Sequence, residues 1–354
     1  MTWQVITGDC LEVMPTLADS SVDLILTDPP YYKVKNLPWD RQWDTPAKFL
    51  EWLDAVLAEF YRVLKPNGSL YLFASPRMAA RVEVLTGERF NVLNHIVWNK
   101  DGGTRANQAS KETLRAFFGD SERIIFAEHY GADGYAKGEA GYTAKCDELR
   151  GFVFEPLRAY LDGERQRAGV SKEDINEALG FRRLGGMAGR HYFSVSQWWL
   201  PTAEHYERMR QAMSRLNHGG EYLRREYEYL RREYEDLRRE YEDLRREYED
   251  LRRPFSVTAD VPYTDVWTFP TVQAYPGKHP AEKPQALLRH IIAASSKPGA
   301  VVLDAFAGSG STGIAARDLG RDFIGIEKDN TWADYARERI AKAAEQARQL
   351  ELIP

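Results

Sequence analysis

The stretch VDLILTDPPYY, from Val22 to Tyr32, is the part of the sequence that best predicts the fold. Val22–Thr27 is an apolar run of strand length, and the two prolines after Asp28 can continue neither a sheet ladder nor a helix. A carboxylate and two tyrosines therefore stand on a stiff turn at the carboxyl end of a strand, where open α/β sheets bind ligands. Asp28 and the Pro29 carbonyl can accept hydrogen bonds from an amino group, and Tyr31 can stack on a planar ring. The plainer alternative is a strand that simply ends at a proline turn.

The composition sets outer limits on the class of protein. The 354 residues carry a formal net charge of −5, so a nucleic-acid site would have to be a local basic face. No apolar run approaches the ~20 residues that span a bilayer, and the N-terminus lacks a signal-like segment. Cys10 and Cys146 have no spacing that suggests a disulfide or a zinc site, which fits a reducing cytoplasm. We therefore expect no metal and no membrane association.

Both ends of the chain have the strand and helix alternation of a mostly parallel sheet. The predicted strands are Trp3–Thr7, Val22–Thr27, Leu70–Phe73, Val92–Trp98, Ile124–Ala127, Asp265–Phe269, Val301–Asp304 and Phe323–Ile326. A helix over Pro46–Leu64 is predicted to end at the breaker Lys65–Gly68. We expect residues 1–130 and 254–354 to form one catalytic domain that is interrupted by an insertion.

Residues 131–220 predict a helical region inserted between these two parts. Its first part, Gly131–Gly151, is rich in glycine and polar residues and predicts a loop. Ser171–Leu179 and Gly189–Leu200, separated by a glycine-containing turn, resemble a helix-turn-helix, so we expect residues 131–220 to be a target recognition region. Trp198 and Trp199 are expected in the core. The side chains predicted to face DNA here are Arg182, Arg183, Arg190, His191, Ser194, Ser196 and Gln197. The alternative is a helical subdomain whose arginines contact only phosphates or solvent.

Residues 221–253 contain a repeat, REYEDLR, with a period of seven. Tyrosines 227, 234, 241 and 248 fall at heptad position a, and leucines 223, 230, 237, 244 and 251 fall at position d. With arginine at e and glutamate at g, this is the pattern of a coiled coil. We expect a coiled-coil-like heptad helix that supports self-association. The alternative is a lone helix held by i,i+4 pairs such as Glu228 with Arg232.

A second candidate site is the glycine-rich stretch DAFAGSGSTG, residues 304–313, between a predicted strand and a predicted helix. Gly308 and Gly310 let a ligand approach the backbone near a helix N-terminus. Glu327 follows 19 residues after Gly308, which matches the ~20-residue spacing of an acid that takes ribose hydroxyls. The sequence has no GK[ST], so the pattern favours an adenosine ligand without phosphates over a dinucleotide. A plain tight turn with a surface glutamate is the alternative.

DPPY at Asp28–Tyr31 and DAFAGSGSTG together resemble the DNA amino-methyltransferases that use S-adenosylmethionine. The glycine motif comes last in the chain, which resembles the beta class of that family. The resemblance covers about residues 3–129 and 265–340, and where the family usually has FxGSGTT this chain has Phe306 followed by GSGST. Further matching segments are GDC at Gly8–Cys10, VLKPNGSLYLF, VWNK at Val97–Lys100, HPAEKP at His279–Pro284 and GIEKD at Gly325–Asp329.

The resemblance implies an α/β fold with a mixed seven-stranded, Rossmann-like sheet and helices on both faces. It implies that Asp28, Pro29, Pro30 and Tyr31 are catalytic. The residues that it implies for cofactor binding are Asp9, Cys10, Asp28, His279, Lys283, Pro284, Asp304, Phe306, Gly308, Ser309, Gly310, Ser311, Thr312, Glu327 and Lys328. Beside the DPPY site, Lys33, Lys35 and Arg41 are expected to grip the DNA strand.

The activity implied is transfer of a methyl group from S-adenosylmethionine to the N6 amino group of adenine in duplex DNA. The base would be flipped out and stacked on Tyr31, and attack would be direct. Aspartate at the head of DPPY resembles the adenine enzymes more than the cytosine-N4 ones. The alternatives are cytosine-N4 methylation, methylation of an RNA or protein amide, and a non-catalytic DNA-binding regulator. A bacterial or phage-encoded homodimer in the cytoplasm is expected, and a restriction partner cannot be deduced.

Overall fold

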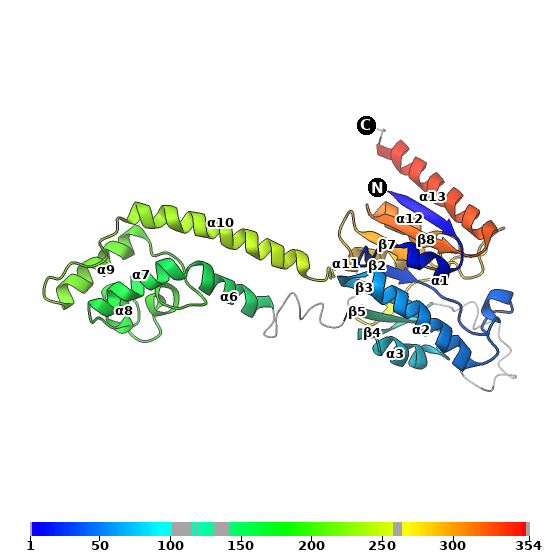
Figure 1. Ribbon diagram of the computed structural model, residues 1–354, viewed down its shortest axis with the longest axis horizontal. Coiled ribbons are helices and arrows are strands. Elements are labelled where there is room, and N and C mark those ends of the chain that lie inside the picture. The colour runs from blue at the N-terminus through cyan, green and yellow to red at the C-terminus, as the bar shows by residue number, and fades with distance from the viewer. Residues whose placement is uncertain are drawn as a thin grey trace. The chain divides into compact units, whose positions relative to one another are not determined.

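The computed structural model describes residues 2–100, 115, 117, 119–129, 142–257 and 264–351. The chain forms two compact units (Figure 1). The first, here named the α/β unit, combines Met1–Ala132 with Arg253–Pro354. The second, named the helical unit, is Asp133–Arg252. The α/β unit is therefore built from both ends of the chain.

The α/β unit is organised around a mixed sheet. Its strands are β1 (Trp3–Thr7), β2 (Val22–Thr27), β3 (Leu64–Ala74), β4 (Phe90–Asn99), β5 (Ser121–His129), β6 (Val266–Thr268), β7 (Val301–Asp304) and β8 (Asp322–Glu327). Their order in space is β1-β8-β7-β2-β3-β5-β4-β6, and β5 is antiparallel to both of its neighbours. Strands β2 and β7 are parallel neighbours, with Leu24 beside Val302. From this pair the chain winds outward in opposite directions, so β2 and β7 mark the topological switch point of the sheet.

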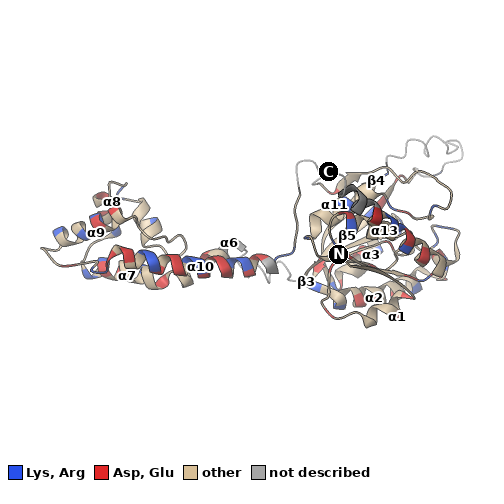
Figure 2. Cartoon of the chain, turned by 90° about the horizontal axis from the view of Figure 1, so that it is seen from above, with Lys and Arg blue, Asp and Glu red and all other residues tan. Residues whose placement is uncertain are grey.

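Helices cover both faces of the sheet, as Figures 1 and 2 show. They are α1 (Cys10–Val13), α2 (Pro46–Val63), α3 (Ala79–Gly87), α11 (Gln285–Ser295), α12 (Ser311–Asp318) and α13 (Asn330–Glu351). Strand side chains alternate between two cores: Ile25 and Leu72 pack with α1, α2 and α3, whereas Leu26 and Phe73 pack with α11, α12 and α13. The near-continuous apolar runs of β2 and β3 reflect burial on both faces.

The sheet differs in two details from what we predicted. Among the described residues it has the eight strands that the residue pattern predicted, rather than the seven that the resemblance implied, with the three-residue β6 at the edge beside β4. The helix α2 ends at Val63, as the breaker Lys65–Gly68 predicted, but these four residues belong to β3, which begins at Leu64. Its register to β2 jumps from Val22–Leu64 to Leu24–Ser69. The extra residues bulge out of the ladder, which is how a strand accommodates a proline.

The helical unit contains α6 (Tyr142–Val153), α7 (Glu155–Arg167), α8 (Lys172–Ala178), α9 (Ala203–Leu216) and α10 (Tyr227–Leu251). The heptad segment is thus helical from Tyr227 rather than Glu221. Its seam packs inside the unit: Leu230 and Tyr241 are buried, and Phe154 lies 5.4 Å from the Tyr234 ring. Figure 2 shows basic and acidic residues interspersed along α10. The coiled-coil pairing between chains stays a prediction.

Three predictions for the helical unit are wrong in detail. Residues 142–151 are helical rather than loop, because α6 packs against α10. The second helix of the predicted helix-turn-helix ends after one turn at Tyr192, because the chain folds back and the Trp199 amide donates to the His191 carbonyl. Trp198 is buried as expected, but Trp199 is 38% exposed. Ser171 begins α8 with a capping box, in which its side chain and that of Asp174 each accept from the other's backbone amide.

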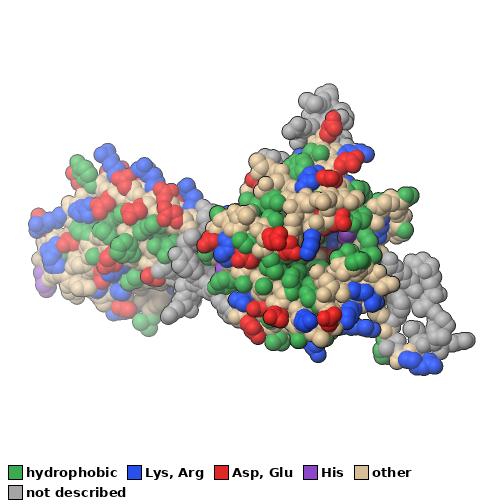
Figure 3. Space-filling view, turned by 45° about the vertical axis from the view of Figure 1, so that its right-hand side comes forward, with side chains coloured by type: hydrophobic (Ala, Val, Ile, Leu, Met, Phe, Trp, Pro, Cys, Tyr) green, Lys and Arg blue, Asp and Glu red, His purple; other side chains and the backbone are tan. Residues whose placement is uncertain are grey.

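A transmembrane segment requires a long apolar helix. No helix in the described parts of the chain combines the necessary length and hydropathy. Basic and acidic side chains are interspersed on the face of the molecule drawn in Figure 3.

Candidate active site

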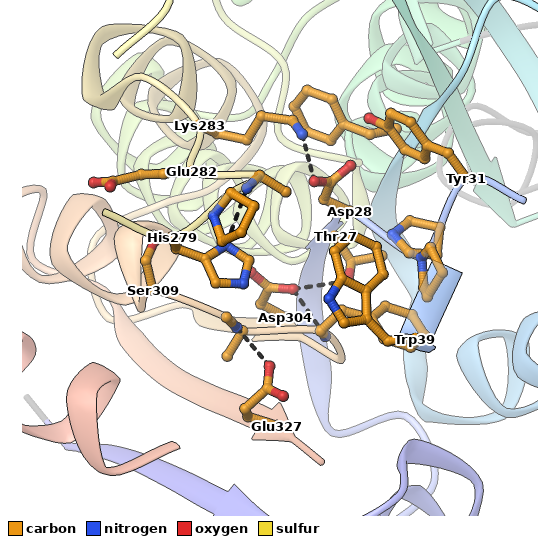
Figure 4. A pocket seen from close by; sticks show the side chains of 18 of the residues that line it. Thr27, Asp28, Tyr31, Trp39, His279, Glu282, Lys283, Asp304, Ser309 and Glu327 are labelled. Carbon is orange, nitrogen blue, oxygen red and sulfur yellow. Dashed lines mark hydrogen bonds and ion pairs between the residues drawn. The ribbon is translucent and has the colours of Figure 1, made fainter. Parts of the chain in front are cut away.

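A single cleft in the α/β unit contains both predicted sites. It lies at the carboxyl ends of β2 and β7, where the Thr27 hydroxyl donates to the Asp304 carboxylate at 2.8 Å. The cleft has a volume of about 730 Å³, and Asp28 and Gly308 both line it (Figure 4). The parallel pairing of strands from opposite ends of the chain therefore places the two motifs side by side.

Asp28 belongs to a buried network of charges at one end of this cleft. Lys283 Nζ contacts its Oδ2 atom (Figure 4). The same Nζ lies 3.4 Å from Glu122 Oε2. Glu122 also accepts hydrogen bonds from the Tyr31 hydroxyl at 2.9 Å and from Lys100 Nζ at 2.5 Å. The other oxygen of Asp28, Oδ1, is buried without a hydrogen-bond partner among the described residues. A buried acceptor without a donor is costly and points to a missing N–H or O–H ligand.

The electrostatics of this network separate its two carboxylates. Burial raises the pKa of Asp28; the Lys283 cation opposes that shift and Glu122 reinforces it. Burial also opposes ionisation of Glu122, yet the Lys283 and Lys100 cations hold its pKa at about 2. The pKa of Lys283 is raised, because Asp28 and Glu122 outweigh the effect of burial. A proton that enters the network is therefore held by Asp28 in preference to Glu122.

The turn after Asp28 is held by a carboxylate that the sequence did not single out. Asp40 is fully buried, accepts the Tyr31 amide at 2.7 Å and also accepts the Lys35 amide. Tyr32 turns away and donates to the Asp44 carbonyl. As a result only the Tyr31 ring faces the cleft, with Lys283 Nζ 5.3 Å from its centroid.

The glycine motif forms a tight turn at the other end of the cleft. Gly308 has φ +48°, and a Cβ there would come 3.0 Å from the His279 ring. Gly310, with φ +73°, is the N-cap of α12, and a Cβ there would collide with Ala336. The Gly308 amide donates to Glu327 at 2.8 Å. These two positions thus require glycine, and the turn opens its backbone to the cleft.

The polar side chains of this motif are tied to one another. The Asp304 carboxylate accepts from Thr27, the Phe306 amide and Thr312 at 2.7–3.1 Å, and burial raises its pKa to about 6. The hydroxyls of Ser309 and Ser311 are 2.8 Å apart. Asp304 therefore fixes the end of β7 to β2 and to the start of α12, which sets the shape of the turn.

The HPAEKP segment, residues 279–284, closes the same cleft. The His279 ring meets Trp332 edge-on at 4.5 Å, and burial together with the Lys283 cation lowers its pKa to about 4. His279 is therefore neutral at pH 7. Pro284 is the N-cap of α11, so the segment that carries Lys283 is anchored to a core helix.

The remaining predicted cofactor residues lie around the turn after β1. Asp9 caps α1 through the Leu11 amide and pairs with Lys328 at 2.9 Å. Burial raises the pKa of Cys10 to about 12, so its thiol is not a nucleophile at neutral pH. Cys10, Asp9, Lys328 and Phe306 all line the cleft.

The predicted DNA-facing residues fall in two places. Lys33, Lys35 and Arg41 are exposed on the loop after DPPY. In the helical unit Arg182, Arg190 and Gln197 are exposed, and His191 stacks on Trp199 at 3.8 Å. Ser194 and Ser196 are half-buried. Arg183 is exposed but bound to Asp174 and Glu177, so its charge is already partly neutralised.

Two residues of the charge network were missed by sequence reasoning. Glu122 begins β5, which is antiparallel, so its first residues meet the carboxyl end of β3 through the Arg123–Ala74 pairing. Lys100 follows β4, whose Trp98 pairs with Glu122. A charged residue just before the apolar run Ile124–Ala127 was the available signal. The direction of β5, which brings Glu122 to the carboxyl end of β3, could not be deduced from the sequence.

Within the described ranges no group of three or more histidine, cysteine, aspartate or glutamate side chains could hold a metal ion.

Comparisons with known proteins agree on one family. The family profile described as DNA methylase, N6_N4_Mtase, matches residues 22–338. The chain is 25% identical over 343 residues to the DNA adenine methyltransferase YhdJ of Escherichia coli K12, covering 96% of this chain and 83% of that protein. It is 23% identical over 371 residues to the Type II methyltransferase M.HinfI of Haemophilus influenzae, covering 99% and 71%.

Among solved structures, the PvuII DNA methyltransferase, described as cytosine-N4-specific, superimposes with a TM-score of 0.51 at 12% identity. The alignment covers 98% of this chain and 92% of that one, and it shows a shared fold. The family profile extends over most of the sequence and includes both motifs of the cleft. The chain belongs to the DNA methylase family.

Proposed function

We propose that this protein transfers a methyl group from S-adenosylmethionine to the N6 amino group of adenine in duplex DNA. The observation that carries the proposal is the free, buried Oδ1 of Asp28 in the same cleft as the Gly308 turn. An amino group is the donor that such an oxygen needs, and the turn suits an adenosine ligand. The named relatives YhdJ and M.HinfI support the same reaction class.

The residues present fit the methyl donor. S-adenosylmethionine supplies an electrophilic methyl group on a sulfonium. Gly308 leaves open the space that a Cβ would fill, and Glu327 offers carboxylate oxygens for ribose hydroxyls. Asp9 and Cys10 lie by the adenine end of this half of the cleft in our assignment, and neutral His279 closes it without adding a positive charge beside the sulfonium.

Asp28 and Pro29 activate the target amine in this proposal. The Asp28 Oδ1 atom and the Pro29 carbonyl accept its two N–H hydrogens, which favours a tetrahedral nitrogen whose lone pair faces the donor. The carbon–nitrogen bond forms as the carbon–sulfur bond breaks, and the nitrogen is left with one proton too many. Asp28, whose pKa is raised by burial, is positioned to accept that proton. Positioning supplies much of the rate.

The duplex must open for this geometry to be reached. We propose that the target base is flipped into the cleft and stacked on Tyr31, as enzymes that act on bases generally require. Lys33, Lys35 and Arg41 then contact phosphates beside the cleft, and the exposed Arg182, Arg190 and Gln197 read or grip the duplex from the helical unit.

A cytosine-N4 activity is the second candidate, because the PvuII enzyme with that description shares the fold. Aspartate at the head of the DPPY motif favours adenine. The homodimer is also a proposal. Light scattering of the purified chain tests it, with twice the chain mass expected and a single chain mass contradicting it.

The experiment that tests the proposed function is nucleoside analysis of unmodified genomic DNA after incubation with the purified protein and S-adenosylmethionine carrying a deuterated methyl group. Genomic DNA is used because the recognition sequence is unknown. We expect labelled N6-methyldeoxyadenosine by mass spectrometry, and long-read modification mapping then gives the site. Labelled N4-methyldeoxycytidine alone would reverse the base assignment, and no labelled nucleoside would contradict the proposal.

A matched control excludes a general effect of substitution in this assay. Lys65 pairs with Asp23 at 2.7 Å near the start of β2, at the opposite end of that strand from Asp28. Lys65→Met removes a lysine from a carboxylate pair in the same sheet without altering the cleft. Its labelling is expected to equal that of the wild type.

A further inference from the structure

The proposed reaction uses Asp28 and Tyr31, but it leaves two buried charges unexplained. Lys283 is 9% exposed at its side chain and Glu122 is 14% exposed. Burial of two such charges costs several kcal/mol each unless they are well paired. Lys283 lies between Asp28 and Glu122, and Glu122 also holds the Tyr31 hydroxyl and Lys100.

The two carboxylate oxygens of Asp28 have different contacts. Oδ2 is held by Lys283, whereas Oδ1 is buried and free. A carboxylate with both oxygens free could rotate and present either one. With Oδ2 fixed by a cation that is itself held by Glu122, rotation of the carboxylate is restricted, and Oδ1 is left as the oxygen without a hydrogen-bond partner in the part of the chain that the structure describes.

We propose that Lys283 and Glu122 are a positioning pair for the target amine. Lys283 holds one oxygen of Asp28 so that the other faces the amine, and Glu122 holds Lys283 together with the Tyr31 hydroxyl. This inference rests on the proposed function and adds two residues to its site. The formal charges of Asp28, Glu122, Lys283 and Lys100 cancel, so the positive charge that arrives with the methyl group is the only net charge of the network.

Lys283 and Glu122 shift the pKa of Asp28 in opposite directions. Reaction requires Asp28 as a carboxylate, which the Lys283 cation favours and the Glu122 anion opposes. The other groups nearby do not reverse this. Tyr31 lowers the pKa of Asp28, in the same direction as Lys283. Asp304 carries the same sign as Glu122, His279 is neutral at pH 7, and Lys100 acts through Glu122. Loss of Lys283 therefore disfavours the reactive form, and loss of Glu122 favours it.

The test compares Lys283→Met, Glu122→Gln and the double variant by the pH dependence of kcat/KM for methyl transfer to DNA, which reports groups of the free enzyme. We expect the acid limb to move to higher pH in Lys283→Met and to lower pH in Glu122→Gln. At neutral pH the single variants are expected to lose about a hundredfold and about tenfold in kcat, which is the range for residues that orient the groups of a site.

The double variant provides the sharpest comparison. Because Glu122→Gln reverses the electrostatic effect of Lys283→Met, the double variant is expected to be more active at neutral pH than Lys283→Met alone. Lys283→Arg, which keeps the charge, is expected to keep the acid limb of the wild type. Losses that multiply in the double variant, or acid limbs that stay in place in both single variants, would overturn the inference.

Two measurements separate this result from misfolding and from failure of the proposed function. S-adenosylhomocysteine affinity by calorimetry is expected to stay within about twofold in Glu122→Gln, and a large loss there would overturn a positioning role. Lys65→Met is expected to have an unchanged pH profile. A wild-type protein without methyl transfer contradicts the proposed function, whereas an active wild type with unmoved acid limbs contradicts only the positioning pair.

Discussion

The cleft of the α/β unit and the helix α10 of the helical unit use charge in opposite ways. In the α/β unit, Lys283 and Asp28 pair with side chains that are 9% and 17% exposed. In the helical unit, the Arg239–Asp236 pair of α10 is 75% and 70% exposed, and most pairs along that helix are similar. Exposed pairs contribute ~0–1 kcal/mol, whereas burial of a charge is costly and is retained mainly where chemistry needs it. Ionic groups therefore matter most for function in the cleft, where they are buried, rather than along the exposed face of α10.

The units also differ in how they use aromatic rings. Around the cleft, Tyr31 and Trp39 face open space, while in the helical unit Tyr234 and Tyr241 fill the core against Phe154. In the first arrangement the ring faces are accessible to a ligand, and in the second they are covered by packing. Four pairs of variants test these differences.

The largest effect is expected from the buried charge. Asp28→Asn replaces an acceptor oxygen by a donor and leaves Lys283 without its nearest counter-charge, so kcat for methyl transfer should fall a hundredfold or more. Asp236→Asn, which removes an exposed partner of Arg239, should leave kcat unchanged. Steady-state kinetics on DNA measure both. Equal losses of kcat in Asp28→Asn and Asp236→Asn would contradict a special role for the buried charge.

Two tyrosines of α10 provide the next comparison. Tyr241 is 7% exposed and packs on Phe154, whereas Tyr229 on the same helix is 61% exposed. Tyr241→Ala should lower the free energy of unfolding by about 3 kcal/mol in urea, and Tyr229→Ala should change it by less than about 0.5 kcal/mol. If Tyr241→Ala instead halved the mass and left the unfolding free energy intact, the heptad seam would act between chains.

Two glycines with positive φ separate ligand contact from backbone strain. Gly308 lies in the cleft against His279, while Gly299, with φ +80°, has open space around its Cβ position. Both alanine variants should destabilise the fold by about 1 kcal/mol. Only Gly308→Ala should also weaken S-adenosylhomocysteine binding, by about tenfold in calorimetry. An undiminished affinity in Gly308→Ala would remove the glycine turn from the cofactor site.

The smallest effect is expected from single arginines of the helical unit. Arg190 is exposed, whereas Arg183 is bound to Asp174 and Glu177. Arg190→Gln should reduce the slope of log affinity against log salt for duplex DNA by about 1, and Arg183→Gln should reduce it by less. Fluorescence anisotropy over a salt series measures the slopes. A larger loss in Arg183→Gln would mean that its ion pairs open on DNA.

The α/β unit was predictable because several independent patterns agreed there. The apolar runs of β2 and β7 predicted strands, the motifs that follow them predicted ligand sites, and parallel strands end at one edge of a sheet. Glu122 escaped prediction because its position depends on the antiparallel direction of β5. Lys283 was recognised within a motif, but its contact with Asp28 joins residues far apart in the sequence.

The helical unit was less predictable because its patterns serve more than one structure. A heptad seam looks the same whether it packs on another chain or on Phe154 and α6 of its own unit. Residues 193–200 lack a helix because the buried Trp198 donates its Nε1–H to the Tyr192 carbonyl and holds the chain in a turn. Tertiary contacts of this kind override local propensity.

The central claim is that the free Oδ1 atom of Asp28 receives the amine that is methylated, beside a donor held at the Gly308 turn. The most direct measurement is a crystal structure of the protein with a cognate duplex and S-adenosylhomocysteine. We expect this structure to contain an extruded adenine stacked on Tyr31, with its N6 atom about 2.7–3.2 Å from Oδ1. An adenine that remains in the duplex while Asp28 contacts only the cofactor would contradict it.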